Sequence, residues 1–306
     1  MRTLFPFQLA TWNRRAQFAV VLCCALALKL YYSAASANQL RWILAPTTAL
    51  VELVSGRSFA FESNAGYLSD DRSFLIAASC AGVNFLITAF LMLALRKLWT
   101  DRSREQTADN ATRRDSATSR GDVRSSLATT SLRNRLNGRA WGFIPLALLV
   151  AYLATLVANT ARISIALWLR RAALGTGWLS AGQLHRLEGI LVYFGFLLLL
   201  YLVSEKLSSR SRASAVTLQG AVSLESASSL PPHASGARRS PGWLRRSLFP
   251  LMIYYATALG IPLANSVYHG KIAAADFWEH SLFVLLAPLF LLLTVTAVRL
   301  QRSNQN

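Results

Sequence analysis

The sequence predicts an all-α integral membrane protein, a polytopic bundle of helices. Of its 306 residues, 53% are hydrophobic and only 15% are charged, whereas a typical soluble domain is about one quarter charged. The net charge of +18 would suggest nucleic-acid binding in a soluble chain. Here the basic residues lie between long apolar runs, where positive charge marks the cytoplasmic side of a membrane. We therefore expect the protein to lie in the lipid bilayer and to bind no nucleic acid.

Six apolar runs come close to the roughly 20 residues that a helix needs to cross the hydrocarbon core. They lie at 16–32, 73–95, 141–161, 187–204, 247–266 and 277–298. No small-residue cleavage site follows the first run, so we expect it to be retained as a span. The shorter stretch 40–54 carries Arg41, Pro46 and Glu52, and it is expected to be interfacial or re-entrant, with a short span as the alternative.

Two polar segments separate the groups of spans. Residues 99–139 and 205–245 are rich in Ser, Arg, Thr and Ala and have little hydrophobic patterning, which predicts disordered linkers. They divide the chain into an N-terminal part (1–98), a central part (140–204) and a C-terminal helical hairpin (246–306).

The distribution of Lys and Arg predicts the orientation. The N-terminus, residues 96–139, residues 205–246 and the C-terminal tail hold 23 of the 32 basic residues, and the segments on the opposite side hold eight. The richer side is expected to be cytoplasmic, so both termini and both linkers face the cytoplasm. The remaining basic residue, Lys29, lies near the outer end of the first span and can extend its charged group to the interface.

This orientation brings three reactive residue types to the outer side of the membrane. Cys80 is expected about seven residues into the run 73–95 from its outer end, a depth of roughly 10 Å. Arg162 follows the outer end of the run 141–161, and His185 precedes the run 187–204. Each also has a structural interpretation: a small packing residue, a helix-end anchor and an interfacial histidine. Their coincidence at one level favours a site.

Neighbouring polar and small residues are candidates for a supporting role because helix spacing puts them near these three side chains. They are Gly82 and Asn84 after Cys80, Asn159 before Arg162, and Glu188 and Gly189 after His185. Helix packing and interhelical hydrogen bonds would explain Gly82 and Asn84 equally well, and Glu188 has Arg186 or Arg170 as alternative partners.

The three central residue types suit nucleophilic catalysis. A thiol reacts as the thiolate, which a cation and a base favour. His185 is the candidate base and later the acid for a leaving amine, and Arg162 is the candidate stabiliser of a thiolate or an oxyanion. Cys23 and Cys24, adjacent in the first run, are interpreted as packing residues. No His/Cys cluster has metal-ligand spacing, so neither a metal nor a cofactor is expected.

The motifs at these residues resemble those of the exosortase/archaeosortase family of membrane cysteine transpeptidases. They are SCAG (79–82), NTARI (159–163), similar to the family's Asn-x-x-Arg-Ile, and HRLEG (185–189), similar to its His-x-x-x-Gly. The stretch 38–56, followed by FESNAGYLSDD, resembles the subfamily called exosortase K. The sequence departs from the family pattern at Ser79, where an acidic residue often stands close before the cysteine.

The resemblance implies a multi-pass protein of the bacterial inner membrane with its site on the extracytoplasmic side. Its substrates would be secreted proteins that end in a short motif, a transmembrane helix and a basic cluster. Cys80, Arg162 and His185 would cleave at the motif and transfer the acyl group to an acceptor. A transporter or receptor with an outward-facing polar site, and a scaffold without chemistry, remain the alternatives. A transport path would require polar residues through the full depth of the membrane, but here they gather near the outer side.

Overall fold

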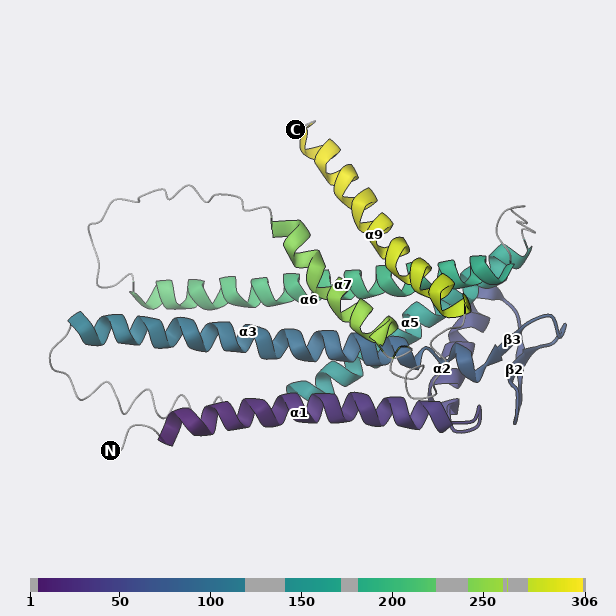
Figure 1. Cartoon of the computed structure of the whole chain (residues 1–306), viewed down its shortest axis with the longest axis horizontal. Helices are drawn as coiled ribbons and strands as arrows, with labels where there is room; N and C mark the ends of the chain where they lie inside the picture. The colour runs from purple at the N-terminus through teal and green to yellow at the C-terminus, as the bar shows by residue number, and fades with distance from the viewer. Residues whose placement is uncertain are drawn as a thin grey trace. The chain divides into compact units, whose positions relative to one another are not determined.

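The computed structural model is mostly helical (Figure 1). It describes residues 5–118, 141–171, 181–223, 242–260, 263 and 275–304. The chain forms two compact units, Met1–Leu167 and Trp168–Asn306, and each unit is described by itself below.

Five helices contain segments that are long and apolar enough to cross a membrane. These helices are α1 (Phe5–Ala34), α3 (Val83–Thr118), α5 (Phe143–Arg171), α6 (Ala181–Ser223) and α9 (Ala275–Asn304). The prediction of a helical membrane protein agrees with these five helices. The predicted run 247–266 gives the shorter apolar helix Leu248–Ala258, part of α7 (Gly242–Ala258), so the described residues do not provide a sixth helix of spanning length.

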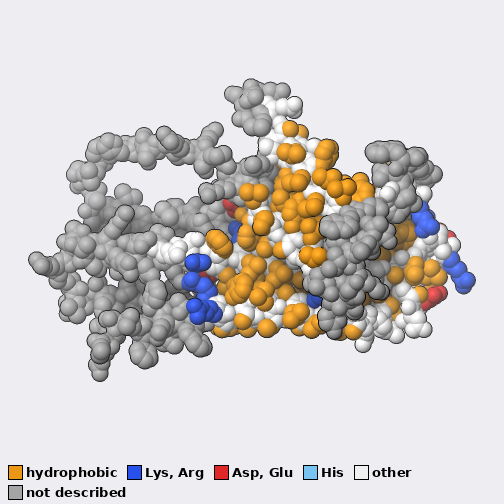
Figure 2. All heavy atoms as spheres, viewed as in Figure 1, with side chains coloured by type: hydrophobic (Ala, Val, Ile, Leu, Met, Phe, Trp, Pro, Cys, Tyr) orange, Lys and Arg blue, Asp and Glu red, His pale blue; other side chains and the backbone are white. Residues whose placement is uncertain are grey.

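The outward faces of these helices are apolar, as a lipid environment requires. On α5 the residues Leu146, Leu149, Leu153 and Val157 follow one another at helical spacing, and each is at least 52% exposed. Figure 2 shows hydrophobic side chains spread over the middle of α1 and α3, with Lys and Arg nearer the ends of this surface. A soluble protein would expose far less contiguous apolar surface.

The structure differs from the sequence prediction at the start of both linkers. Helix α3 continues to Thr118 and α6 continues to Ser223, so the first part of each segment predicted to be disordered is helical. Neither helical extension contains proline, and Ala and Arg favour helix, so nothing in the sequence ends the helices where the apolar runs end. The rest of the two predicted linkers lies outside the described residues.

The expectation of an all-α fold is wrong in one region. Three short strands, β1 (Phe59–Glu62), β2 (Gly66–Ser69) and β3 (Leu75–Ala77), form an antiparallel sheet in the order β1-β2-β3. Gly66 allows the strands to approach closely, because it has a φ of 125° and an added Cβ would lie 2.3 Å from a β3 carbonyl oxygen. The run predicted as a span from residue 73 therefore begins as a strand.

Asp71 stabilises the turn between β2 and β3. Its Oδ1 accepts hydrogen bonds from the Ser69 hydroxyl (2.6 Å), the Ser73 hydroxyl (2.8 Å) and the Ser73 N–H (3.0 Å). Its Oδ2 lies 3.2 Å from Nη1 of Arg57. The serine hydrogen bonds, together with the Arg57 charge, hold the pKa of the Asp71 carboxyl well below its usual range. The turn is thus organised around an ionised carboxylate.

Helix α2 (Arg41–Ser55) corresponds to the stretch predicted to be interfacial or re-entrant. Its 15 residues amount to about 22 Å, less than the roughly 30 Å of a hydrocarbon core. Pro46 lies inside the helix and provides no N–H for the Trp42 carbonyl one turn earlier. The hydroxyl of Tyr152, from α5, donates to that carbonyl instead at 2.9 Å. The rings of Trp42 and Tyr152 also stack, with centroids 5.7 Å apart. The carbonyl that Pro46 leaves without a helical donor thus becomes a contact between α2 and α5.

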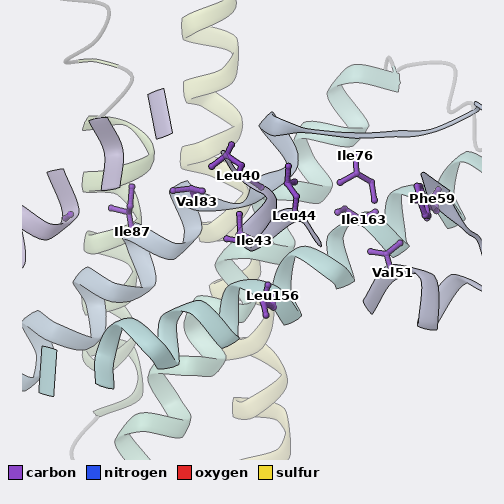
Figure 3. Packing of buried hydrophobic residues seen from close by; sticks show 13 residues of the cluster. Leu40, Ile43, Leu44, Val51, Phe59, Ile76, Val83, Ile87, Leu156 and Ile163 are labelled. Atoms are coloured by element: carbon purple, nitrogen blue, oxygen red, sulfur yellow. The ribbon is translucent and has the colours of Figure 1, made fainter. Parts of the chain in front are cut away.

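A hydrophobic cluster in the first unit joins α2 to the sheet and to the spans (Figure 3). Its members include Leu40, Ile43, Leu44, Val51, Phe59, Ile76, Val83, Ile87, Leu156 and Ile163. These residues come from the start and body of α2, from β1 and β3, and from α3 and α5. The cluster therefore fixes the segment that connects β3 to α3 against α2 and α5.

Candidate functional site

Cys80 lies in a short connection between the sheet and a long helix. It belongs to η1 (Ala78–Ala81), a single 3₁₀ turn that follows β3 directly. Gly82 then adopts a left-handed conformation with φ of 70°, and its carbonyl accepts from the N–H groups of Phe85 (2.9 Å) and Leu86 (3.1 Å). Helix α3 thus begins after Gly82. The prediction that Cys80 lies seven residues inside a helical span is wrong, because a strand and a 3₁₀ turn take up the start of the apolar run.

Cys80 lies just before the N-terminus of α3. The N-terminus of an α-helix carries the equivalent of about half a positive charge and several backbone N–H groups without a helical partner. Cys80 is partly buried two residues before Gly82, the residue that caps α3.

Asn159 connects α5 to the Cys80 turn. Its side chain is fully buried, and its Nδ2 donates a hydrogen bond to the backbone carbonyl of Cys80 at 2.5 Å. The two residues are 79 positions apart in the sequence. The contact fixes the backbone of η1, and it leaves the Cys80 side chain to other neighbours.

Arg162 lies three residues after Asn159 in the same helix and is partly buried. Tyr32, in the last turn of α1, lies near both Cys80 and Arg162. Tyr32 and Cys80 also pack against the same hydrophobic cluster, of which Ile163 is a member. The structure therefore brings Cys80, Asn159 and Arg162 into one neighbourhood of the first unit.

Asn84 takes a different place from the one that helix spacing predicts. Because Cys80 lies in η1 and Asn84 in α3, they are not one turn apart on a single helix. Asn84 is exposed, and its Oδ1 accepts a hydrogen bond from Nζ of Lys29 at 3.4 Å. That nitrogen also lies 5.5 Å from the centroid of the Tyr32 ring. Asn84 thus connects α3 to α1.

His185 belongs to the second unit, near the start of α6. Its imidazole is exposed, and its Nδ1 lies 3.3 Å from Oε2 of Glu188, whose side chain is buried. A carboxylate at this distance from Nδ1 is an ion-pair partner for a protonated imidazole. Gly189 is buried directly after this pair.

Two residues were not among the predicted site residues: Tyr32, which lies near Cys80, and Lys29, which contacts Asn84 and the Tyr32 ring. The sequence signal was present, because a tyrosine and a lysine near the end of an apolar run are common interfacial anchors. Because such anchors are common, the two residues do not indicate a site until their contacts in the folded protein are known. Cys23 and Cys24 lie within α1, where Cys23 is exposed and Cys24 is partly buried.

Among the described residues, no group of three or more His, Cys, Asp or Glu side chains is arranged to hold a metal ion. No family model matches the chain, and no curated protein or solved structure gives a significant match. The resemblance to exosortases therefore depends on sequence motifs alone, namely those around Cys80, Arg162 and His185 and the stretch that begins at residue 38.

Proposed function

We propose that this protein is a membrane-embedded cysteine peptidase or transpeptidase that acts on C-terminal sorting signals of secreted proteins. The observation that carries the proposal is the hydrogen bond from the buried Asn159 to the Cys80 backbone. It holds a cysteine at the start of a long helix, with Arg162 one turn further along α5. A packing cysteine needs neither a buried amide on its backbone nor a neighbouring guanidinium.

The chemistry follows from these groups. The Cys80 sulfur, as thiolate, attacks the carbonyl carbon of the scissile peptide bond and forms a tetrahedral intermediate with a negative oxygen. Arg162 and the N–H groups at the start of α3 are suited to stabilise charge on the sulfur and on that oxygen. When the intermediate collapses, the carbon–nitrogen bond breaks, the amine leaves with a proton, and a thioester to Cys80 remains. Water, an amine or a hydroxyl then attacks the thioester and releases the thiolate.

In this proposal His185 carries the proton. It takes the proton from the thiol and delivers it to the leaving amine, then repeats the exchange with the acceptor. Glu188 orients the His185 imidazole through its carboxylate, which lies 3.3 Å from Nδ1. The role requires the second unit to bring His185 to Cys80 in the working enzyme.

The proposed substrates carry a short motif before a transmembrane helix and a basic tail. The helix would lie in the bilayer beside the apolar spans, and the motif would emerge at the extracytoplasmic level. This orientation rests on the 23 basic residues assigned to the opposite side. Reporter fusions at Arg120, Glu225 and Asn304 are expected to report the cytoplasm, and a fusion at Ile272 the outside. An extracytoplasmic signal from the reporter at Arg120 would invert the predicted topology and put the Cys80 site on the cytoplasmic side of the membrane.

Cleavage of a co-expressed secreted protein of this kind, with trapping of a thioester adduct, tests the chemistry. Cys80→Ala and Cys80→Ser are expected to abolish processing, because a hydroxyl is hardly ionised at neutral pH. Arg162→Lys is expected to fail, since an ammonium does not reproduce the planar fork of guanidinium donors. His185→Ala should lower the rate by about a hundredfold or more.

Cys23→Ala is the matched control, because it removes a thiol from α1 without touching the Cys80 turn. It is expected to leave both processing and accumulation unchanged. Processing at the wild-type rate by the Cys80→Ala protein would refute the enzyme and leave a transporter, a receptor or a scaffold.

A further inference from the structure

The hydrogen-bond register of the sheet determines which backbone groups of β3 point outward. The N–H of Ser69 donates to the carbonyl of Phe74 at 2.9 Å, and Tyr67 lies opposite Ile76 two positions further along. In an antiparallel pair the hydrogen-bonded positions alternate. Ile76 therefore directs its N–H and carbonyl toward β2, and the N–H and carbonyl groups of Leu75 and Ala77 point away from the sheet.

The two edges of the sheet differ. At the β1 edge, the N–H of Phe59 donates to Oε1 of Glu52 in α2 at 2.8 Å, so a side chain of the protein occupies the start of that edge. At the β3 edge, none of the described residues forms a hydrogen bond with the N–H of Leu75 or Ala77. The side chain of Leu75 is 39% exposed. An edge strand with available N–H and carbonyl groups is a template for pairing with another extended chain.

The β3 edge leads directly to Cys80. The backbone at Ala77 is still extended, with φ of −79° and ψ of 172°, and Cys80 follows three residues later in η1. A 3₁₀ turn rises about 2 Å per residue, so Cys80 lies roughly 6 Å beyond the end of the strand. An extended peptide advances about 3.3 Å per residue. A peptide paired with β3 would reach the level of Cys80 within about two residues.

We propose that the substrate segment next to the scissile bond binds as an additional strand on the outward edge of β3. This inference rests on the proposed function of Cys80 as the nucleophile. The backbone groups of Leu75 and Ala77 supply hydrogen bonds that any extended peptide satisfies, and the exposed Leu75 side chain offers an apolar contact to alternate side chains of the peptide. The occupant is an extended polypeptide, since a helix has already used its backbone groups internally.

Ala77→Pro isolates this interaction. Proline removes the outward N–H of residue 77, and its fixed φ near −65° fits the observed −79°. No hydrogen bond to β2 is lost, because the Ala77 N–H points away from that strand. Ala77→Ser retains the N–H and is the matched control. Equal thermal stability of the two variants in detergent would show that the sheet is intact in both.

The probe is a random-sequence octapeptide library with a photocrosslinking benzophenone at the fourth position. It is applied to the full-length Cys80→Ala protein in nanodiscs, where no turnover occurs, and crosslinked sites are located by mass spectrometry. We expect crosslinks at β3 and η1 and a yield about 2-fold to 10-fold lower in the Ala77→Pro background, from the loss of one backbone hydrogen bond. The Ala77→Ser background should match Cys80→Ala, and an N-methylated library should not crosslink at β3.

Wild-type protein treated with the same library separates this inference from the proposed function. One outcome is a hydroxylamine-sensitive adduct on Cys80 together with a crosslink yield that Ala77→Pro does not change. It would overturn the strand-addition inference and remain consistent with the proposed enzyme. Crosslinks at β3 that depend on residue 77, with no adduct on Cys80, would support peptide docking and count against the enzyme. The absence of crosslinks at β3 would overturn the inference.

Discussion

Replacement of Asn159 by leucine tests whether the amide holds the Cys80 turn in place. Leucine has the same branching as asparagine and a similar volume, so it fills the buried position without a large cavity. It cannot donate to the Cys80 carbonyl, which Asn159 now binds at 2.5 Å. Loss of one partner at a buried hydrogen bond costs about 1–3 kcal/mol.

This cost predicts the size of the effect on the thiol. Since about 1.4 kcal/mol corresponds to a tenfold change in an equilibrium constant, the Cys80 turn should open roughly 5-fold to 150-fold more often. The Cys80 thiol is partly buried, so its alkylation rate should rise toward this factor, up to the rate of an exposed thiol. Processing of a substrate should fall in the same variant, because the sulfur is no longer held in position.

The assay is the rate of N-ethylmaleimide labelling of Cys80 in nanodiscs, in a background where Cys23 and Cys24 are alanine. Thr155→Val is the matched control on the same helix. Thr155 is as buried as Asn159, but its hydroxyl donates only within α5, to the Ala151 carbonyl at 2.7 Å. A wild-type labelling rate in Asn159→Leu, together with a lowered melting temperature, would show that Asn159 stabilises α5 and not the Cys80 turn.

Two further predictions concern the framework around the site. Tyr152→Phe should lower stability by about 0.5–1.5 kcal/mol, because it removes the hydroxyl that donates to the Trp42 carbonyl. In a Pro46→Ala background the helix supplies its own N–H to that carbonyl, so the loss of stability on thermal unfolding should be smaller. An equal loss in both backgrounds would refute the idea that the Tyr152 hydroxyl replaces the missing N–H. Gly66→Ala should destabilise the protein far more than Gly56→Ala in the same assay, since a Cβ at Gly66 would lie 2.3 Å from a carbonyl oxygen, whereas Gly56 has only its left-handed φ to accommodate. Similar melting temperatures for the two alanine variants would contradict the close approach of β2 and β3.

Several features of the site follow from local sequence patterns. The spacing of Asn159 and Arg162 predicts a shared helix face, and both lie in α5 one turn apart. The spacing of His185 and Glu188 predicts a possible contact, and the structure has it at 3.3 Å. These relations could be predicted because the helix repeat alone places residues three apart side by side.

The predicted relation between Cys80 and Asn84 fails for the same physical reason. Periodicity assumes that the helix is continuous, but the run SFLIAASCAG forms a strand, a 3₁₀ turn and a left-handed glycine before α3 begins. An apolar run of strand length followed by a helix looks like one span when only hydrophobicity is read. The small sheet was missed because its strands are three or four residues long.

The sequence by itself determined the apolar helices, because burial in lipid requires long stretches of hydrophobic side chains whatever their neighbours are. It also identified Cys80 and Arg162, which lie in one neighbourhood of the folded first unit. Only the tertiary structure decided that the Asn159 amide binds the carbonyl of Cys80, 79 positions away, and that Tyr152 replaces the N–H missing at Pro46. A buried polar group must find some partner, but which partner it finds depends on how the helices and the sheet pack, and no local pattern in the chain encodes that choice.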